Sequence, residues 1–232
     1  MTRLRRTGEN EQGFTLVEML VVMTVFGLVI GLVYSVLLKV QLFASNTQTS
    51  AEAASQVRLA LAQIDRQVRS GNVLYAPTNG IDCLGAPVAN PAGNPTPNAG
   101  ACMRVYTQAN GAQRCVQWQV VKETDAAGLP SSFGPRADRS LLRSRSWAPT
   151  WQTDGDLSSW VMQARGLALA SAVPAFTLQG AATAYSSRLL DVQFEAVDSR
   201  AGSRNTLIEA SLSGRNTNYG YDAGLCQPAP PA

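Results

Sequence analysis

Residues 13–38 read GFTLVEMLVVMTVFGLVIGLVYSVLL, and this stretch decides how the chain is built. From Met19 to Leu38 it carries no charge over 20 positions. A helix of that length spans about 30 Å, which matches the hydrocarbon core of a bilayer. Three arginines stand within the first six residues, and no matching cluster follows soon after Leu38. Because positive charge stays on the cytoplasmic side, the sequence predicts a single-pass anchor with a cytoplasmic N-terminus and an exported remainder.

Glu18 is the one charged residue within this stretch. A carboxylate near the bilayer core is costly unless it is paired, so an ionisable residue in such a segment predicts a function. The alternative is a tilted anchor whose Glu18 only extends its carboxylate to the membrane surface. Gly13-Phe14-Thr15-Leu16-Val17-Glu18, behind a short basic leader, resembles the box of type IV pilin-like precursors.

The resemblance implies how this box is processed and used. A membrane prepilin peptidase would cut after Gly13, so that residues 1–13 are the leader, and would methylate the new amino terminus on Phe14. Glu18 would then pair with the N-terminal amine of a neighbouring subunit during assembly. The partners implied are the peptidase, other pilin or pseudopilin subunits, an inner-membrane assembly platform and membrane lipid.

The size of the chain and the strands predicted late in it, described below, look most like those of PilW-type minor pilins or J-type pseudopilins. The first implies a structural subunit that primes or joins a pilus-type filament for adhesion, motility or DNA uptake. The alternative is a pseudopilin of type II secretion. Either implies the bacterial inner membrane before processing, and a surface or periplasmic filament afterwards.

Gly27 and Gly31 form a G-x-x-x-G pair within the apolar run. This spacing places both on one helix face and permits close approach of another helix. Glycine is also common in membrane helices generally, so chance is an equal explanation.

A long helix is predicted from Phe14 to Ser70, with a transmembrane or filament-core part over 14–40 and an amphipathic continuation over 41–70. Gly71 and Asn72 give a plausible C-cap. The continuation carries an apolar stripe at helical spacing, which indicates packing on the protein's own sheet or, alternatively, a short coiled coil. The stripe consists of Ala54, Val57, Leu61, Ile64 and Val68.

Beyond the helix, residues 71–101 hold five prolines among Gly, Asn and Ala and predict a loop. Residues 102–232 predict an antiparallel β head domain with a C-terminal tail, because apolar and polar residues alternate there. The fold class is therefore α+β and pilin-like. The predicted strands are 103–107, 114–122, 140–147, 175–179, 188–197 and 206–213.

The four cysteines lie on the exported side, where paired disulfides are expected. Asn110-Gly111 predicts a hairpin turn. If these are its central residues, Cys115 falls opposite Tyr106 and Cys102 opposite Gln119, too far apart for a mutual bridge. The preferred pairing is Cys83 with Cys102 and Cys115 with Cys226. Cys83 with Cys115 and Cys102 with Cys226 is the alternative.

Enzymatic activity is not expected. The chain has no histidine, which removes the commonest general base and metal ligand, and no nucleophile, phosphate-binding or zinc motif occurs. Asp154 and Asp156 are candidate acid/base carboxylates, but a Gly-containing segment favours solvated turn residues. We expect no catalytic residues, no cofactor and no metal site.

Nucleic acid is a further, weakly supported candidate partner. Arg143, Arg145 and Trp147 alternate on one predicted strand face, with Arg136 and Arg139 just upstream. Arginine beside an aromatic ring can hold phosphate and stack a base. A solvated strand face is favoured instead, since the formal net charge is only +3 over 232 residues.

Overall fold

The computed structural model describes ten parts of the chain, which fall into two units, Met1–Ser45 and Asn46–Ala232. We call the second unit the head unit. The described residues are 13, 15–79, 83, 98–108, 111–126, 134–169, 174–179, 188–198, 205–214 and 224–230.

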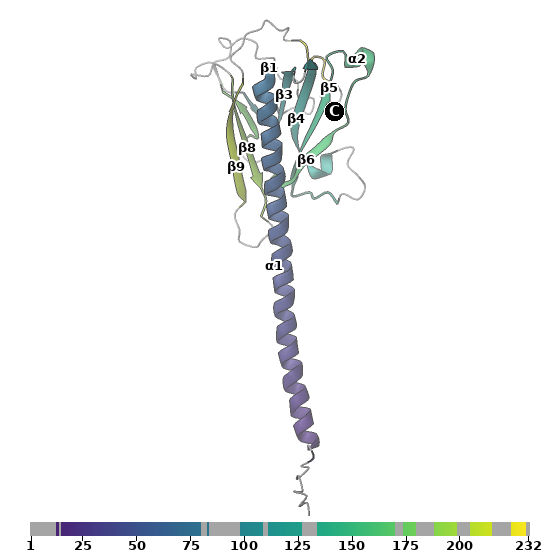
Figure 1. Cartoon of the computed structure of the whole chain (residues 1–232), viewed down its shortest axis with the longest axis vertical. Helices are drawn as coiled ribbons and strands as arrows, with labels where there is room; N and C mark the ends of the chain where they lie inside the picture. The colour runs from purple at the N-terminus through teal and green to yellow at the C-terminus, as the bar shows by residue number, and fades with distance from the viewer. Residues whose placement is uncertain are drawn as a thin grey trace, which may run out of the picture. The chain divides into compact units, whose positions relative to one another are not determined.

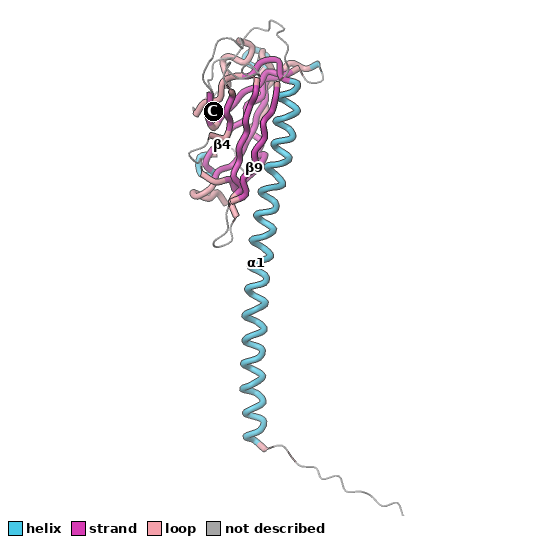
Figure 2. The backbone as a smooth tube through the Cα atoms, turned by 90° about the vertical axis from the view of Figure 1, so that its left-hand side faces the viewer, coloured by secondary structure: helices cyan, strands magenta, loops and turns pink. Residues whose placement is uncertain are grey.

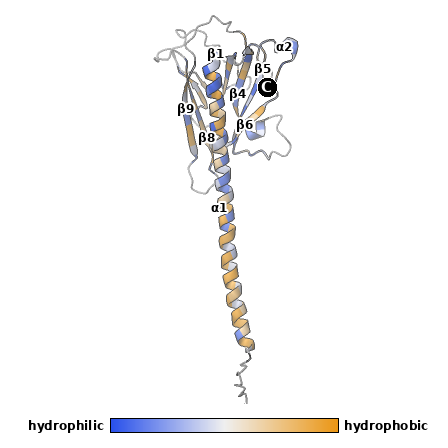
Figure 3. Cartoon of the chain, in the orientation of Figure 1, coloured by the Kyte–Doolittle hydropathy of each residue, from blue (hydrophilic) through white to orange (hydrophobic). Residues whose placement is uncertain are grey.

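Helix α1 (Leu16–Ser70) is a single long helix, as the sequence predicts; Phe14 lies outside the described residues. In the first unit its apolar side chains are exposed, and Figure 3 shows the hydrophobic residues of α1 concentrated there. An 18-residue window of α1 has a mean hydropathy of 2.6. Among the described residues, α1 alone is long and apolar enough to cross a membrane.

The described residues of the head unit form an antiparallel sheet of nine strands, most of which are labelled in Figure 1. The strand order is β1-β3-β4-β5-β6-β8-β7-β2, and β9 pairs with β8 beside this path. The strands are β1 (Gly71–Leu74), β2 (Asn98–Gly100), β3 (Cys102–Thr107), β4 (Arg114–Lys122), β5 (Ser140–Trp147), β6 (Val161–Leu167), β7 (Phe176–Leu178), β8 (Leu189–Ala196) and β9 (Thr206–Ser213). A short helix α2 (Trp151–Asp154) and a 3₁₀ turn (Glu123–Asp125) connect strands. The α+β pilin-like arrangement is therefore confirmed.

All six predicted strands are present, with bounds that differ by at most one residue at either end. The prediction of a loop over 71–101 is wrong at its two ends, where β1 and β2 form. These strands have four and three residues, too few for an alternating pattern to stand out. Strand β6 was missed because Arg165 and Gly166, with φ of 70° at the glycine, interrupt its alternation.

Gly71 does not act as the predicted C-cap, since it enters β1 directly and lacks a positive φ. A Cβ atom here would lie 2.7 Å from Cγ1 of Val105 on the neighbouring β3. Close approach of the two segments, and not a left-handed turn, therefore requires glycine.

The main core lies between α1 and one face of the sheet; Figure 2 shows the helix on one side of the strands. The buried row of α1 is Ala53, Val57, Ala60, Ile64 and Val68. It packs against residues that include Val105, Trp118, Leu142 and Phe194. The predicted stripe is thus correct at three positions, but Ala54 and Leu61 are only partly buried, because Ala53 and Ala60 face the sheet more directly.

The opposite face of β3, β4 and β5 is covered by the chain's C-terminal segment, residues 224–230. A second cluster includes Tyr75, Tyr106, Trp147 and Cys226. The backbone N–H of Cys226 donates to the Tyr75 hydroxyl at 3.2 Å, and Nη1 of Arg104 donates to the Cys226 carbonyl at 2.8 Å. Residues 224–230 therefore form a second packed layer of the head unit.

Both preferred disulfides are present, Cys83–Cys102 and Cys115–Cys226. The predicted register is also confirmed, with Tyr106 opposite Cys115 and Cys102 opposite Gln119. Asn110 of the predicted turn lies outside the described residues, while Gly111 has the positive φ of 76° that such a turn requires.

Candidate assembly site at the start of helix α1

The first turn of α1 is organised by Thr15 and Glu18. Thr15 precedes the helix, and its Oγ1 accepts a hydrogen bond from the backbone N–H of Glu18 at 3.3 Å. Its carbonyl accepts from the N–H of Met19 at 3.2 Å. Thr15 is thus the N-cap, and Glu18 occupies the third helical position, where a negative charge complements the helix dipole.

Thr15 is a site residue that the sequence reasoning missed. The signal was present, because Thr-x-x-Glu before an apolar run is the capping-box pattern. The cap fixes where the helix starts, so it also fixes the direction in which Glu18 leaves the backbone.

Thr24 and Ser35, two other polar residues of the apolar run, are satisfied within the helix itself. Oγ1 of Thr24 donates to the Val21 carbonyl at 2.8 Å, and Oγ of Ser35 donates to the Leu32 carbonyl at 2.8 Å. Within the described part of the chain, no hydrogen bond or ion pair reaches the Glu18 carboxylate. Glu18, the one charged residue of this run, therefore has a carboxylate without a partner among the described residues.

Gly27 and Gly31 leave open surface on α1. An added Cβ at either position would meet no atom within 4 Å, apart from the local helix backbone. Another helix backbone could approach closely here, as the spacing predicts.

The comparisons with known proteins bear on this same segment. Residues 9–34 match the family model described as the prokaryotic N-terminal methylation motif. The match supports a type IV pilin-like family. It implies processing by prepilin peptidase and assembly with other pilin subunits, and together with the apolar helix it indicates membrane anchoring. No curated protein and no solved structure matches the chain.

The predicted arginine face of β5 is not exposed to solvent. Arg143 and Arg145 are each only 5% exposed. Both guanidinium groups stack on the ring of Trp160, at 4.0 and 4.3 Å from its centroid. Gln119 accepts two hydrogen bonds from Arg143, whose pKa is lowered by burial.

Arg145 is held in the same layer. Its Nε donates to Gln117 and its Nη2 donates to the Pro230 carbonyl at 2.7 Å. Both the nucleic-acid and the solvated-face interpretations of this strand are therefore wrong for Arg143 and Arg145. The alternation resembled a solvent-facing strand because its cover, Trp160 and Pro230, lies elsewhere in the sequence.

The two carboxylates considered for acid/base chemistry lie in an exposed turn. Asp154 accepts from the Thr150 hydroxyl at 2.6 Å and from the Asp156 N–H at 3.0 Å, and these bonds lower its pKa. Asp156 forms an ion pair with Arg114 at 2.7 Å. Both are turn and surface residues, as the sequence favoured.

Proposed function

We propose that the chain is a minor type IV pilin-like subunit that is cut between Gly13 and Phe14, methylated on Phe14 and built into, or used to prime, a pilus-type filament. The observation that carries this is the Glu18 carboxylate, fixed in the first turn of an exposed apolar helix and without a partner in the described residues. Before assembly the chain would sit in the inner membrane with its N-terminus in the cytoplasm.

The chemistry of the cut explains the need for Glu18. Cleavage after Gly13 creates a cationic amine on Phe14, and an apolar filament core would bury it. A carboxylate five residues into the mature chain supplies the opposite charge from a neighbouring subunit. A buried pair of this kind sets register more than it adds net stability, which suits a subunit that must stop at one position.

The open Gly27 and Gly31 surface supports the same function. Once Glu18 fixes the axial register, these glycines would let a neighbouring helix pack closely along α1. The apolar side chains around them are exposed and would be covered by lipid before assembly and by other subunits afterwards.

The test compares Glu18→Ala with Gly13→Leu in cells that make the filament. Gly13→Leu places a side chain at the scissile bond and is expected to leave uncut precursor. Glu18→Ala is expected to be cut and anchored normally, because it makes the segment more apolar. Its content in sheared filaments should fall by at least about tenfold, since the neighbour's amine is left unpaired.

Glu209→Ala is the matched control, because Glu209 is an exposed carboxylate on β9 of the head unit. It should enter filaments as the unmodified chain does. Normal incorporation of Glu18→Ala into filaments would contradict the assembly role proposed for the Glu18 carboxylate.

A type II secretion pseudopilin is the alternative, because the same box and the same pairing would serve a secretion filament. Deletion of the gene separates the two: loss of surface pili with normal protein export supports the minor pilin, and the reverse supports the pseudopilin.

A further inference from the structure

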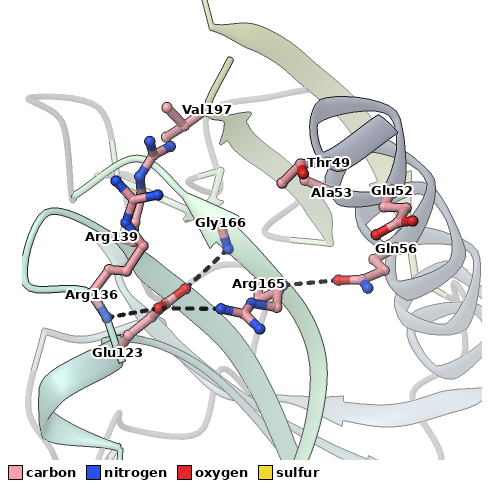
Figure 4. A pocket seen from close by; sticks show the side chains of 10 residues that line it. All are labelled: Thr49, Glu52, Ala53, Gln56, Glu123, Arg136, Arg139, Arg165, Gly166 and Val197. Carbon is pink, nitrogen blue, oxygen red and sulfur yellow. Dashed lines mark hydrogen bonds and ion pairs between the residues drawn. The ribbon is translucent and has the colours of Figure 1, made fainter. Parts of the chain in front are cut away.

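A pocket of about 290 Å³ lies in the head unit between α1 and the region where β6 separates from β8 (Figure 4). Strand β6 pairs with β8 at Leu167 alone, so its edge is otherwise open on that side. Three arginines line the pocket, Arg136, Arg139 and Arg165, with Glu52 and Thr49 on the helix wall. This volume is at the small end of ligand pockets.

Glu123 lines the inner wall of the pocket, and its carboxylate already has hydrogen-bond partners. Its side chain is 1% exposed, and its carboxylate accepts from the backbone N–H of Arg136 at 3.0 Å and of Gly166 at 3.2 Å. Nη2 of Arg165 lies 4.0 Å from it. The Glu123 carboxylate therefore serves as a hydrogen-bond acceptor for the open edge of β6. Gln56 does the same, because its Oε1 accepts from the Arg165 N–H at 3.1 Å.

Arg139 has hydrogen-bonding capacity left over. Its side chain is only 9% exposed, and among the described residues its guanidinium forms a hydrogen bond and ion pair only with Asp138, through Nε at 3.3 Å. The two terminal nitrogens, Nη1 and Nη2, thus have no protein acceptor there. Asp138 is 61% exposed and is shared with Arg136, so it compensates the Arg139 charge weakly.

The facing carboxylate does not fill this gap. Glu52 stands on the helix side of the pocket in Figure 4, and its Oε1 accepts from Nε2 of Gln48 at 2.9 Å. Among the described residues, the terminal nitrogens of Arg139 are therefore donors without an acceptor, and Arg165 adds a second positive charge beside them.

We propose that this pocket binds a small oxyanion, a carboxylate or a phosphate group, on the terminal nitrogens of Arg139 with Arg165 beside it. The fork of a guanidinium matches two oxygens of either group, and a nearly buried arginine forms stronger charge-assisted bonds than an exposed one. The group comes either from a free anion or from an acidic side chain of another subunit.

The test uses the full chain in detergent and follows its melting temperature while sodium phosphate, or separately sodium acetate, replaces sodium chloride at constant ionic strength. Binding to the folded state raises the melting temperature along a saturating curve, whereas exclusion of phosphate from the protein surface gives a rise that does not saturate. Saturation by phosphate indicates a phosphate-bearing ligand, and saturation by acetate alone indicates a carboxylate ligand.

Arg139→Gln is expected to raise the apparent Kd at least about tenfold, because it removes a charge-assisted bidentate contact. Arg69→Gln is the matched control, since Arg69 is an exposed arginine of α1 outside the pocket, and its Kd should stay within about twofold. Arg165→Gln, at a side chain that is 42% exposed, provides a second variant if Arg139→Gln does not fold. A chain that saturates with neither anion, or a Kd unchanged in the variants, would overturn the proposal.

Discussion

At the scale of single residues, the head unit depends on polar side chains that supply hydrogen-bond partners to buried groups. Trp118 is fully buried on β4, and its Nε1 donates to Oε1 of Gln67 on α1 at 2.6 Å. This bond fixes the helix against the sheet at one point, and it satisfies an indole N–H that has no access to water.

Gln67→Leu is expected to lower the free energy of unfolding by about 1 to 3 kcal/mol, because it leaves the Trp118 N–H buried without an acceptor. Urea unfolding of the purified chain measures this. Trp118→Phe in the Gln67→Leu background removes the stranded donor, so the two changes together should cost less than their sum. If the two losses of unfolding free energy were strictly additive, the hydrogen bond between Gln67 and Trp118 would have no coupling energy.

At the scale of elements, α1 has exposed apolar side chains in the first unit and, in the head unit, a buried row that packs on its own sheet. Within the head unit a row of small and branched apolar residues faces the strands, while Leu59 on the other side is 71% exposed. The same helix therefore offers a buried position and an exposed position of similar size for comparison.

Ile64→Ala is expected to destabilise the head unit by about 2 to 5 kcal/mol, since it opens a cavity between α1 and the sheet. Leu59→Ala removes a similar side chain from an exposed position and should change stability by less than about 0.5 kcal/mol. Chemical unfolding of both variants gives the comparison. Similar losses in the two would contradict the packing of this row on the sheet.

The sequence predicted the strands that show a clear alternation and missed those that are short or interrupted. Strand β8 was found because only one of its faces is buried, which imposes alternation of apolar and polar residues. The register of β3 and β4 followed from the turn and disfavoured a bridge between Cys102 and Cys115; of the two pairings left open, the preferred one is present. Strands β1 and β2 are too short to show a pattern, and β6 is interrupted at Gly166.

Candidate sites were predictable only where their residues are contiguous. The box from Gly13 to Glu18 is continuous, and so is the Thr15 cap within it. The pocket around Arg139 brings together α1, the 3₁₀ turn and β6, which are far apart in the sequence, so no local sequence pattern predicts it. The arginine face of β5 was misinterpreted because its cover comes from Trp160 and the C-terminal segment.

At the scale of the whole molecule, the chain combines an N-terminal helix suited to assembly with a disulfide-bonded head. The bridge Cys115–Cys226 spans 111 residues and ties the C-terminal segment to β4. Cys83–Cys102 spans 19 residues and lies next to the start of β3. Both bridges are typical of exported proteins, so they agree with the export of the head that the sequence predicts.

The central claim is that this chain is a processed pilin-like subunit, and the intact mass of the protein recovered from membranes tests it most directly. With an active prepilin peptidase present, we predict the mass of residues 14–232 with one added methyl group and two disulfides. A control pilin from the same cells shows that the peptidase is active. An uncut chain of 232 residues under those conditions would contradict the account.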